Sequence, residues 1–94
     1  MNKQDYIDIA VQYFPDALAE VGKLSVVANN KHNPGEPIHW AREKSNDHWG
    51  SWGRHMSKLG TIDNDSGMIH DSSALWRFLA INQIAIEKDI TRQV

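Results

Sequence analysis

Apolar side chains in the first thirty residues recur every three or four positions, the spacing that places them on one face of an α-helix. The first such face consists of Tyr6, Ile9, Ala10 and Tyr13. Asp5 is placed to cap this helix, and Pro15 ends or kinks it at Phe14. A second helical run follows and fades at Asn29 and Asn30, and its apolar face consists of Leu18, Val21 and Leu24. The pattern therefore predicts two consecutive helices.

The apolar pattern is then interrupted, and residues 31–45 are predicted to form a long central loop. Residues 33–35 (Asn-Pro-Gly) have turn chemistry, and Pro37 forces extended backbone on the residue before it. A third helix is predicted to begin at Ser45 or Asn46. Its apolar stripe consists of Trp49, Trp52, Met56 and Leu59.

The last helix is predicted from Asp71 to Asp89, after a loop at residues 60–67 that is rich in Asp and Ser and is called the acidic loop below. Apolar residues cover most of its circumference, and a helix with that pattern must be buried on several sides. So short a chain supplies few partners, and we therefore expect this helix to pack against another subunit. No stretch alternates with period two. The prediction is one all-α domain over residues 1–94, a compact bundle of three to four helices with a long central loop, assembled as a homo-oligomer (dimer or tetramer).

Composition excludes several classes of protein. The hydrophobic fraction of 40% and the charged fraction of 23% are ordinary for a folded domain. No apolar run is long enough to cross a membrane or to form a signal peptide, so we expect no membrane partner. The absence of cysteine rules out disulfides, thiolate metal sites and cysteine nucleophiles. A net charge of −2 argues against coating of long nucleic acid, and a cytosolic protein is the expectation.

The charge is unevenly distributed along the chain. Residues 31–58 carry five basic against three acidic side chains, together with four of the five histidines and three of the four tryptophans. Phosphates bind charged donors and nucleobases lie against flat aromatic rings, so this tract favours a nucleotide ligand. The alternative interpretation is that the tryptophans belong to the core and the basic residues form a solvated rim.

The usual catalytic patterns are missing. A metal-dependent nucleotide pyrophosphohydrolase needs glutamates three residues apart, and no two glutamates have that spacing. The dyad of His70 and Asp71 would need further ligands, for which His55 and Asp89 are available, but Asp71 fits a helix cap equally well. There is neither a serine nucleophile elbow nor a phosphate-binding glycine loop. We therefore predict no catalytic residue, no metal ligand and no cofactor.

Four motifs in the second half of the chain do form a recognisable series. They are residues 31–35 (Lys-His-Asn-Pro-Gly), 37–45 (Pro-Ile-His-Trp-Ala-Arg-Glu-Lys-Ser), 54–55 (Arg-His) and 63–70 (Asp-Asn-Asp-Ser-Gly-Met-Ile-His). In this order they resemble a family of small phage proteins catalogued as dATP/dGTP diphosphohydrolase-like. Some similar small phage proteins are anti-CBASS sponges, which bind cyclic oligonucleotide immune signals without degrading them. The resemblance implies such a nucleotide-sequestering protein, acting in the host cytoplasm.

On this hypothesis three basic residues contact the phosphates of a cyclic dinucleotide such as cyclic GMP-AMP, namely Arg42, Lys44 and Arg54. Trp40 is the expected surface for base stacking. The rim is completed by hydrogen bonds from Lys31, His32 and His55. Backbone N–H groups of the helix that starts near Asn46 are expected to assist. Asp63 and His70 are expected to hold the junction between the acidic loop and the last helix.

Alternatives stay open at this point. His55 is also consistent with a buried histidine that bonds to Asp63 or Asp65. For the protein as a whole, the alternatives are a small dATP/dGTP diphosphohydrolase and an oligomeric adaptor that binds a host protein through its tryptophans.

Overall fold

The structure, a computed structural model, describes residues 1–44 and 46–93, with side chains up to Asp89. The helices are α1 (Lys3–Tyr13), α2 (Pro15–His32), the short 3-10 helix η1 (Arg42–Lys44), α3 (His48–Met56) and α4 (His70–Gln93). Within the described ranges the one β feature is an isolated bridge between Ile62 and Ile69. The all-α prediction is confirmed. None of the described helices combines the length and the apolar character that a membrane span requires.

The first two helices follow the predicted pattern, with corrections at their ends. Asn2 caps α1 rather than Asp5: the Asn2 side chain accepts from the Asp5 backbone, and the Asp5 carboxylate accepts from the Asn2 backbone. The chain bends at Phe14, before Pro15, as expected. Helix α2 continues two residues beyond Asn30, so Lys31 and His32 lie on its last turn and not in the loop.

Helix α3 starts later than predicted. Ser45 lies outside the described residues, and Asp47 is the cap, with its carboxylate accepting from the backbone N–H of Gly50 at 3.2 Å. A Cβ on Gly50 would lie 2.5 Å from that carboxylate, so glycine lets the cap sit close. The helix ends at Met56, and Leu59 is therefore not on its stripe.

Helix α4 begins at His70, one residue earlier than predicted, and continues past Asp89 to Gln93. Asp71 lies in its first turn, and the Asp71 carboxylate accepts from the backbone N–H of Gly60 at 2.7 Å. Gly60 has a φ of +79°, a conformation that favours glycine. This bond ties the start of the loop between α3 and α4 to the helix that follows it.

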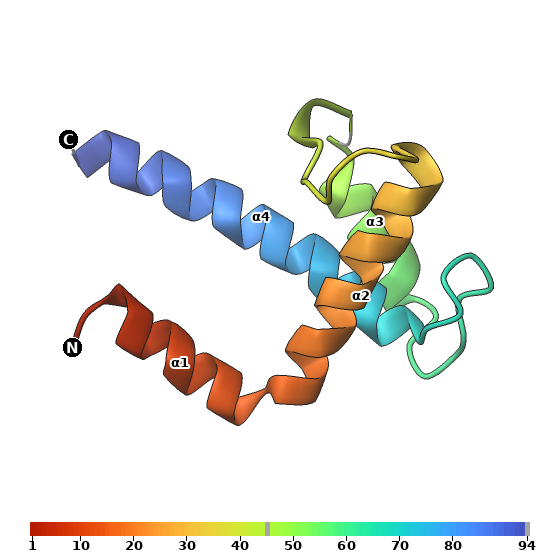
Figure 1. Cartoon of the computed structure of the whole chain (residues 1–94), viewed down its shortest axis with the longest axis horizontal. Helices are drawn as coiled ribbons and strands as arrows, with labels where there is room; N and C mark the ends of the chain where they lie inside the picture. Colours follow the sequence, from red (N-terminus) through yellow and green to blue (C-terminus); the bar gives the residue numbers. More distant parts are fainter. Residues whose placement is uncertain (45, 94) are drawn as a thin grey trace.

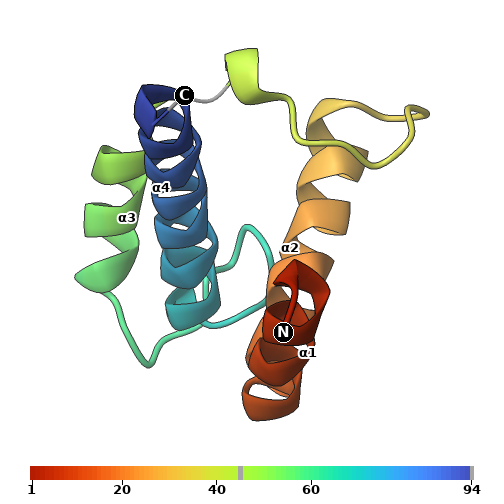
Figure 2. The same cartoon turned by 90° about the vertical axis from the view of Figure 1, so that its left-hand side faces the viewer.

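Helix α4 is the central element of the bundle. It packs against α3 on one side and α2 on the other, while α1 contacts α2 (Figures 1 and 2). A hydrogen bond of 2.9 Å from the Trp76 indole to the Ser25 hydroxyl joins α4 to α2. In Figure 1, α1 leads away from the bundle, and so does the C-terminal half of α4.

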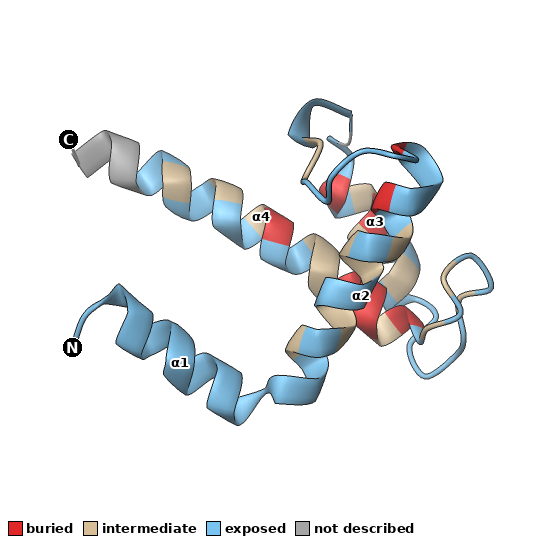
Figure 3. Cartoon of the chain, viewed as in Figure 1, coloured by how far each residue is buried: buried red, intermediate tan, exposed pale blue. Residues whose placement is uncertain are grey.

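The interior is small and largely polar. Among the described residues the only buried hydrophobic ones are Ala74 and Ala80, and no large side chain is fully buried. The radius of gyration is 14.5 Å, against about 12 Å for a typical domain of this length. Helix α1 has no buried residue at all (Figure 3). The buried polar residues are Asn29, Asn33, His48, Ser51, His70, Ser72 and Ser73.

Candidate nucleotide-binding cleft

The C-terminal half of α2, the central loop, the acidic loop and the first turns of α4 surround a cleft of about 750 Å³, here called the central cleft. That volume is in the range of small-molecule binding sites. Five of the seven predicted ligand-binding residues line it: Lys31, His32, Trp40, Lys44 and His55. These residues come from α2, the central loop and α3, so only the tertiary structure brings them together.

The central cleft has a modest excess of positive charge. It is lined by three permanent cations, Lys31, Lys44 and Arg77, and by two carboxylates, Asp63 and Asp65. Lys31 pairs with Asp65 at 2.8 Å, but both side chains are exposed, so this pair contributes little to stability. That same exposure leaves the Lys31 ammonium accessible to an anion.

Lys44 and Arg77 also have polar partners within the chain. Lys44 donates to the Asn33 side-chain oxygen at 2.8 Å, and an Arg77 nitrogen lies 3.1 Å from His48 Nδ1. Burial lowers the pKa of the Arg77 guanidinium from its usual value. Sequence reasoning gave Arg77 no role. The sequence does mark Arg77 as the one arginine within residues 74–86, the apolar stretch of the last helix.

Two predicted phosphate contacts do not line the central cleft. Arg42 donates two hydrogen bonds to Glu87, at 2.6 and 2.9 Å, and its guanidinium lies 4.1 Å from the centre of the Trp40 ring. Hydrogen bonding to Arg42 lowers the pKa of Glu87 to about 2, with a further contribution from Gln83. Arg54 is exposed on α3 and lies 3.4 Å from the Asp47 carboxylate. Within one chain, Arg42 therefore fastens the central loop to α4.

Trp40 lies in an aromatic group rather than alone. It makes edge-to-face contacts with His48 and Trp76, at ring-centre distances of 6.1 and 6.0 Å, while Arg42 lies over its ring. Two buried polar atoms beside the central cleft have no hydrogen-bond partner among the described residues. They are the indole Nε1 of Trp40, a donor, and the side-chain oxygen of Asn29, an acceptor. Such groups are costly to bury unless something pairs with them.

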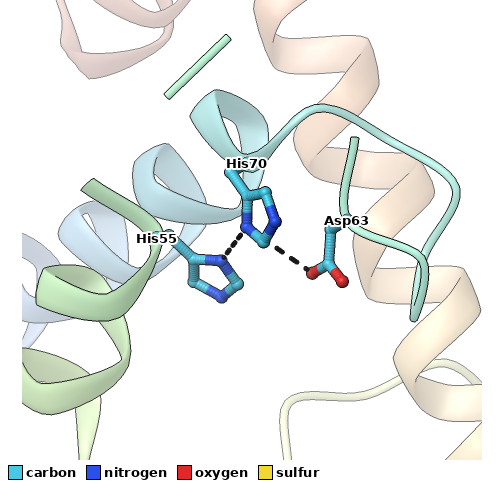
Figure 4. A group of neighbouring side chains, drawn as sticks. All are labelled: His55, Asp63 and His70. Atoms are coloured by element: carbon cyan, nitrogen blue, oxygen red, sulfur yellow. Dashed lines mark hydrogen bonds and ion pairs between the residues drawn. The ribbon is translucent and has the colours of Figure 1, made fainter. Parts of the chain in front are cut away.

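A second group of polar side chains lies at the wall of the central cleft. His55 Nδ1 is 2.8 Å from His70 Nδ1, and His70 Nδ1 is 4.0 Å from an oxygen of Asp63 (Figure 4). In the alternative interpretation His55 bonds to Asp63 or Asp65, but its hydrogen-bond partner in the structure is His70. Burial lowers the pKa of His55, and the neighbouring His70 acts in the same direction while Asp63 opposes it. These surroundings therefore favour the neutral form of His55 more than water does.

The acidic loop fixes the place of Asp63. The Asp63 backbone donates to the carbonyl of Met68 at 2.8 Å, and its own carbonyl accepts from Gly67 at 2.7 Å. Gly67 makes this turn possible with a φ of +77°. The His70 backbone donates to Thr61 at 2.9 Å, which closes the loop onto α4. The expected role of Asp63 and His70 at the loop–helix junction fits these bonds, but their side chains also converge on His55.

Two further interpretations of the sequence, a phosphate at the start of α3 and a metal site that uses Asp71 and Asp89, meet physical obstacles. The Asp47 carboxylate already accepts a backbone N–H at the start of α3, so a phosphate there would face a negative charge. Asp89 lies eighteen residues along α4 from Asp71, about 27 Å at the rise of an α-helix, so the two cannot share one metal site.

Comparison of the chain with known protein families, curated proteins and solved structures found no match.

Proposed function

We propose that this protein binds a nucleotide in the central cleft and holds it without hydrolysing it, as a sponge for a cyclic oligonucleotide signal. The observation that carries the proposal is the gathering of three cations and two tryptophans around one cleft of nucleotide size. Cationic donors suit phosphates, and aromatic rings suit bases. The sequence resembles small phage proteins, some of which are sponges, and for this reason we propose the cyclic oligonucleotide immune signals of the host as the class of ligand.

The cleft also offers groups for reading a base edge. The Asn29 oxygen can accept a hydrogen bond and the Trp40 indole can donate one, and neither has a partner among the described residues. A nucleobase presents both donors and acceptors on its edge. A base that displaced the side chains covering these two buried atoms would pair with groups that a purely apolar ligand would leave unpaired.

Assembly is the second part of the proposal. Helix α1 exposes Tyr6, Ile7, Ile9, Val11 and Tyr13, which together cover about half of its circumference. One chain buries little apolar surface, and a symmetric homo-oligomer would bury the same face in every copy. A two-fold assembly would also present the central cleft twice to a ligand that itself has near two-fold symmetry.

One observation favours a second candidate, a metal-dependent phosphohydrolase. His55, Asp63 and His70 form a group with metal-ligand chemistry at the wall of the same cleft. Against it, among the described residues the acidic ones that line the cleft are Asp63 and Asp65, which do not supply the facing carboxylate pairs of the magnesium-dependent enzymes.

The test is to incubate the protein with cyclic GMP-AMP or with dATP, remove it by filtration, denature it and chromatograph what it releases. A sponge depletes the cyclic dinucleotide and returns it intact, whereas a hydrolase returns product. Recovery of product would replace the proposal with the second candidate. Failure to deplete any nucleotide would overturn both and favour the protein-binding adaptor.

Two matched lysines on α2 and η1 locate the binding site. Lys44→Gln removes a cation from the central cleft and should weaken capture about tenfold or more, since a charge-assisted hydrogen bond contributes about 1.5–3 kcal/mol. Lys23→Gln removes an exposed cation of α2 that does not line the cleft, and it should leave capture unchanged. Equal loss in both variants would place the site elsewhere.

A further inference from the structure

We propose that His55, Asp63 and His70 bind one divalent transition-metal ion at the wall of the central cleft. The three residues come from the last turn of α3, the acidic loop and the first turn of α4 (Figure 4). One ligand atom from each lies within 4.8 Å of the other two. Three ligands bonded at about 2.0–2.2 Å to a common ion must be mutual neighbours on this scale.

Hydrogen bonding accounts for only part of this arrangement. Between the two Nδ1 atoms at 2.8 Å, one ring donates and the other accepts, so a single proton satisfies the pair. The Asp63 oxygen at 4.0 Å from His70 is too far for a hydrogen bond. The other Asp63 oxygen accepts from the Asp65 backbone at 2.9 Å, which orients the carboxylate. A cation would attract all three groups at once.

The ligand set selects the kind of ion. Two imidazole nitrogens and one carboxylate oxygen suit Zn²⁺, and also Mn²⁺, Fe²⁺ and Co²⁺, whereas Mg²⁺ and Ca²⁺ prefer oxygen ligands throughout. Three protein ligands leave at least one coordination position open, which is typical of sites that bind a further ligand rather than of structural sites.

The proposed metal site adjoins the central cleft. His55 and Asp63 both line the central cleft, so an ion that they hold would be within reach of a molecule in that cleft. A phosphate oxygen is a suitable further ligand for such an ion. This last step rests on the proposed nucleotide function, whereas the metal site itself does not depend on it.

The experiment uses untagged full-length protein, freed of metal with a chelator and titrated with ZnCl₂ in a calorimeter. We expect one Zn²⁺ per chain, and Co²⁺ in its place should give the visible absorption of a low-coordinate nitrogen–oxygen site. Absence of binding by Zn²⁺, Co²⁺ and Mn²⁺ to the folded protein would overturn the proposal.

Three variants assign the ligands. His55→Gln and Asp63→Asn should each weaken Zn²⁺ binding at least about tenfold, since even the loss of a group that only hydrogen-bonds to a metal ligand costs about 10–100-fold. Asp63→Asn keeps a side-chain oxygen for the Asp65 backbone, so the loop is retained. His39→Gln changes an exposed histidine that lines the same cleft outside the trio, and it should bind Zn²⁺ as the unaltered protein does. Equal binding by all three variants would contradict the assignment.

Nucleotide capture measured both with Zn²⁺ bound and in the presence of the chelator separates the two proposals. Zn²⁺ binding without nucleotide capture would leave the metal site standing and remove the proposed function. Nucleotide capture without Zn²⁺ binding would leave the proposed function standing and overturn the metal site.

Discussion

Helix α1 and the α3–α4 junction (residues 48–80) differ in where their stability comes from. Helix α1 has strong local signals, a capping box and a continuous apolar face, yet none of its residues is buried. The junction contains a nine-residue helix with two glycines, a weak helix former by itself, yet it holds seven of the nine residues that are buried in the described part of the chain. Local signals therefore determine where helices form, whereas tertiary contacts determine which of them become part of the folded body.

The comparison also bears on the two proposals. The junction supplies fixed side chains for a site, because its loops are closed by hydrogen bonds and its histidines are packed. Helix α1 supplies a large unpartnered apolar surface and no cleft residue. We infer that the junction carries the proposed metal ligands beside the central cleft and that α1 carries the proposed assembly. The predictions below test this division.

The largest effect is expected for a charge on the apolar face of α1. Ile9→Glu should weaken self-association about 100-fold, because burial of such a side chain contributes about 1.5–3 kcal/mol and a buried carboxylate opposes assembly. Sedimentation velocity over a range of concentrations measures the change. Gln12→Glu places the same charge on the polar face of the same helix and should sediment as the unaltered protein. A monomeric unaltered protein, or equal dissociation in both variants, would contradict the role of α1.

A smaller effect is expected for tryptophans at the junction. Trp52 is half-buried, and its ring centre lies 6.2 Å from that of Phe78 on α4. Trp52→Ala should lower the free energy of unfolding by about 2–3 kcal/mol, less than the loss of a fully buried tryptophan. Trp49 also lies 6.2 Å from Phe78 but is 60% exposed, and Trp49→Ala should cost less than about 1 kcal/mol. Urea denaturation measures both, and equal losses would mean that exposure does not separate them.

Two glycines should respond to alanine with opposite signs. Gly67 has a φ of +77° in the acidic loop, so Gly67→Ala should destabilise the protein by about 1–2 kcal/mol. Gly22 lies inside α2 with open space around its Cα, so Gly22→Ala should stabilise it by about 0.5–1 kcal/mol. Thermal denaturation compares the two variants. Stabilisation by alanine at Gly67 would show that the loop geometry is not needed for folding.

The smallest effect concerns the contact between Arg42 and Glu87. The folded pKa of Glu87, about 2, is below its ordinary value of 4.5, so the contribution of this contact is complete above pH 4.5 and is lost as the pH falls towards 2. Both side chains are exposed, so the contribution should be small and weaken with salt. In the Glu87→Gln variant the free energy of unfolding should therefore fall less steeply as the pH decreases from 4.5 towards 2, and pH-dependent denaturation measures this difference. An NMR titration in which Glu87 changes near pH 4.5 would contradict the contact.

Much of the fold could be predicted from the sequence, because helix signals are local. The face of Tyr6, Ile9 and Tyr13, the bend before Pro15 and the all-α class follow from spacing and from proline geometry. The ends of helices were predicted less well. The cap at Asp47 in place of Asn46 depends on which side chain reaches a backbone N–H, and neighbouring polar residues compete for that role.

The candidate site divides in the same way. The composition showed that cations and aromatic rings are concentrated in residues 31–58. It did not distinguish Lys44, which lines the cleft, from Arg42, which binds Glu87 on a distant turn of α4. Arg77 and Asn29 were missed because they contribute through burial beside the cleft, which a sequence does not display.

By itself, the sequence determined that the chain forms helices, where it bends and which tract carries the cations and tryptophans, since these depend on neighbours a few residues apart. Only the tertiary structure decided that His55, Asp63 and His70 converge. They lie on three elements separated by turns, and their meeting depends on two left-handed glycines and on the packing of α3 against α4. The convergence of these side chains depends on tertiary packing, because the spacing of residues within one helix or loop does not determine how the next element is oriented.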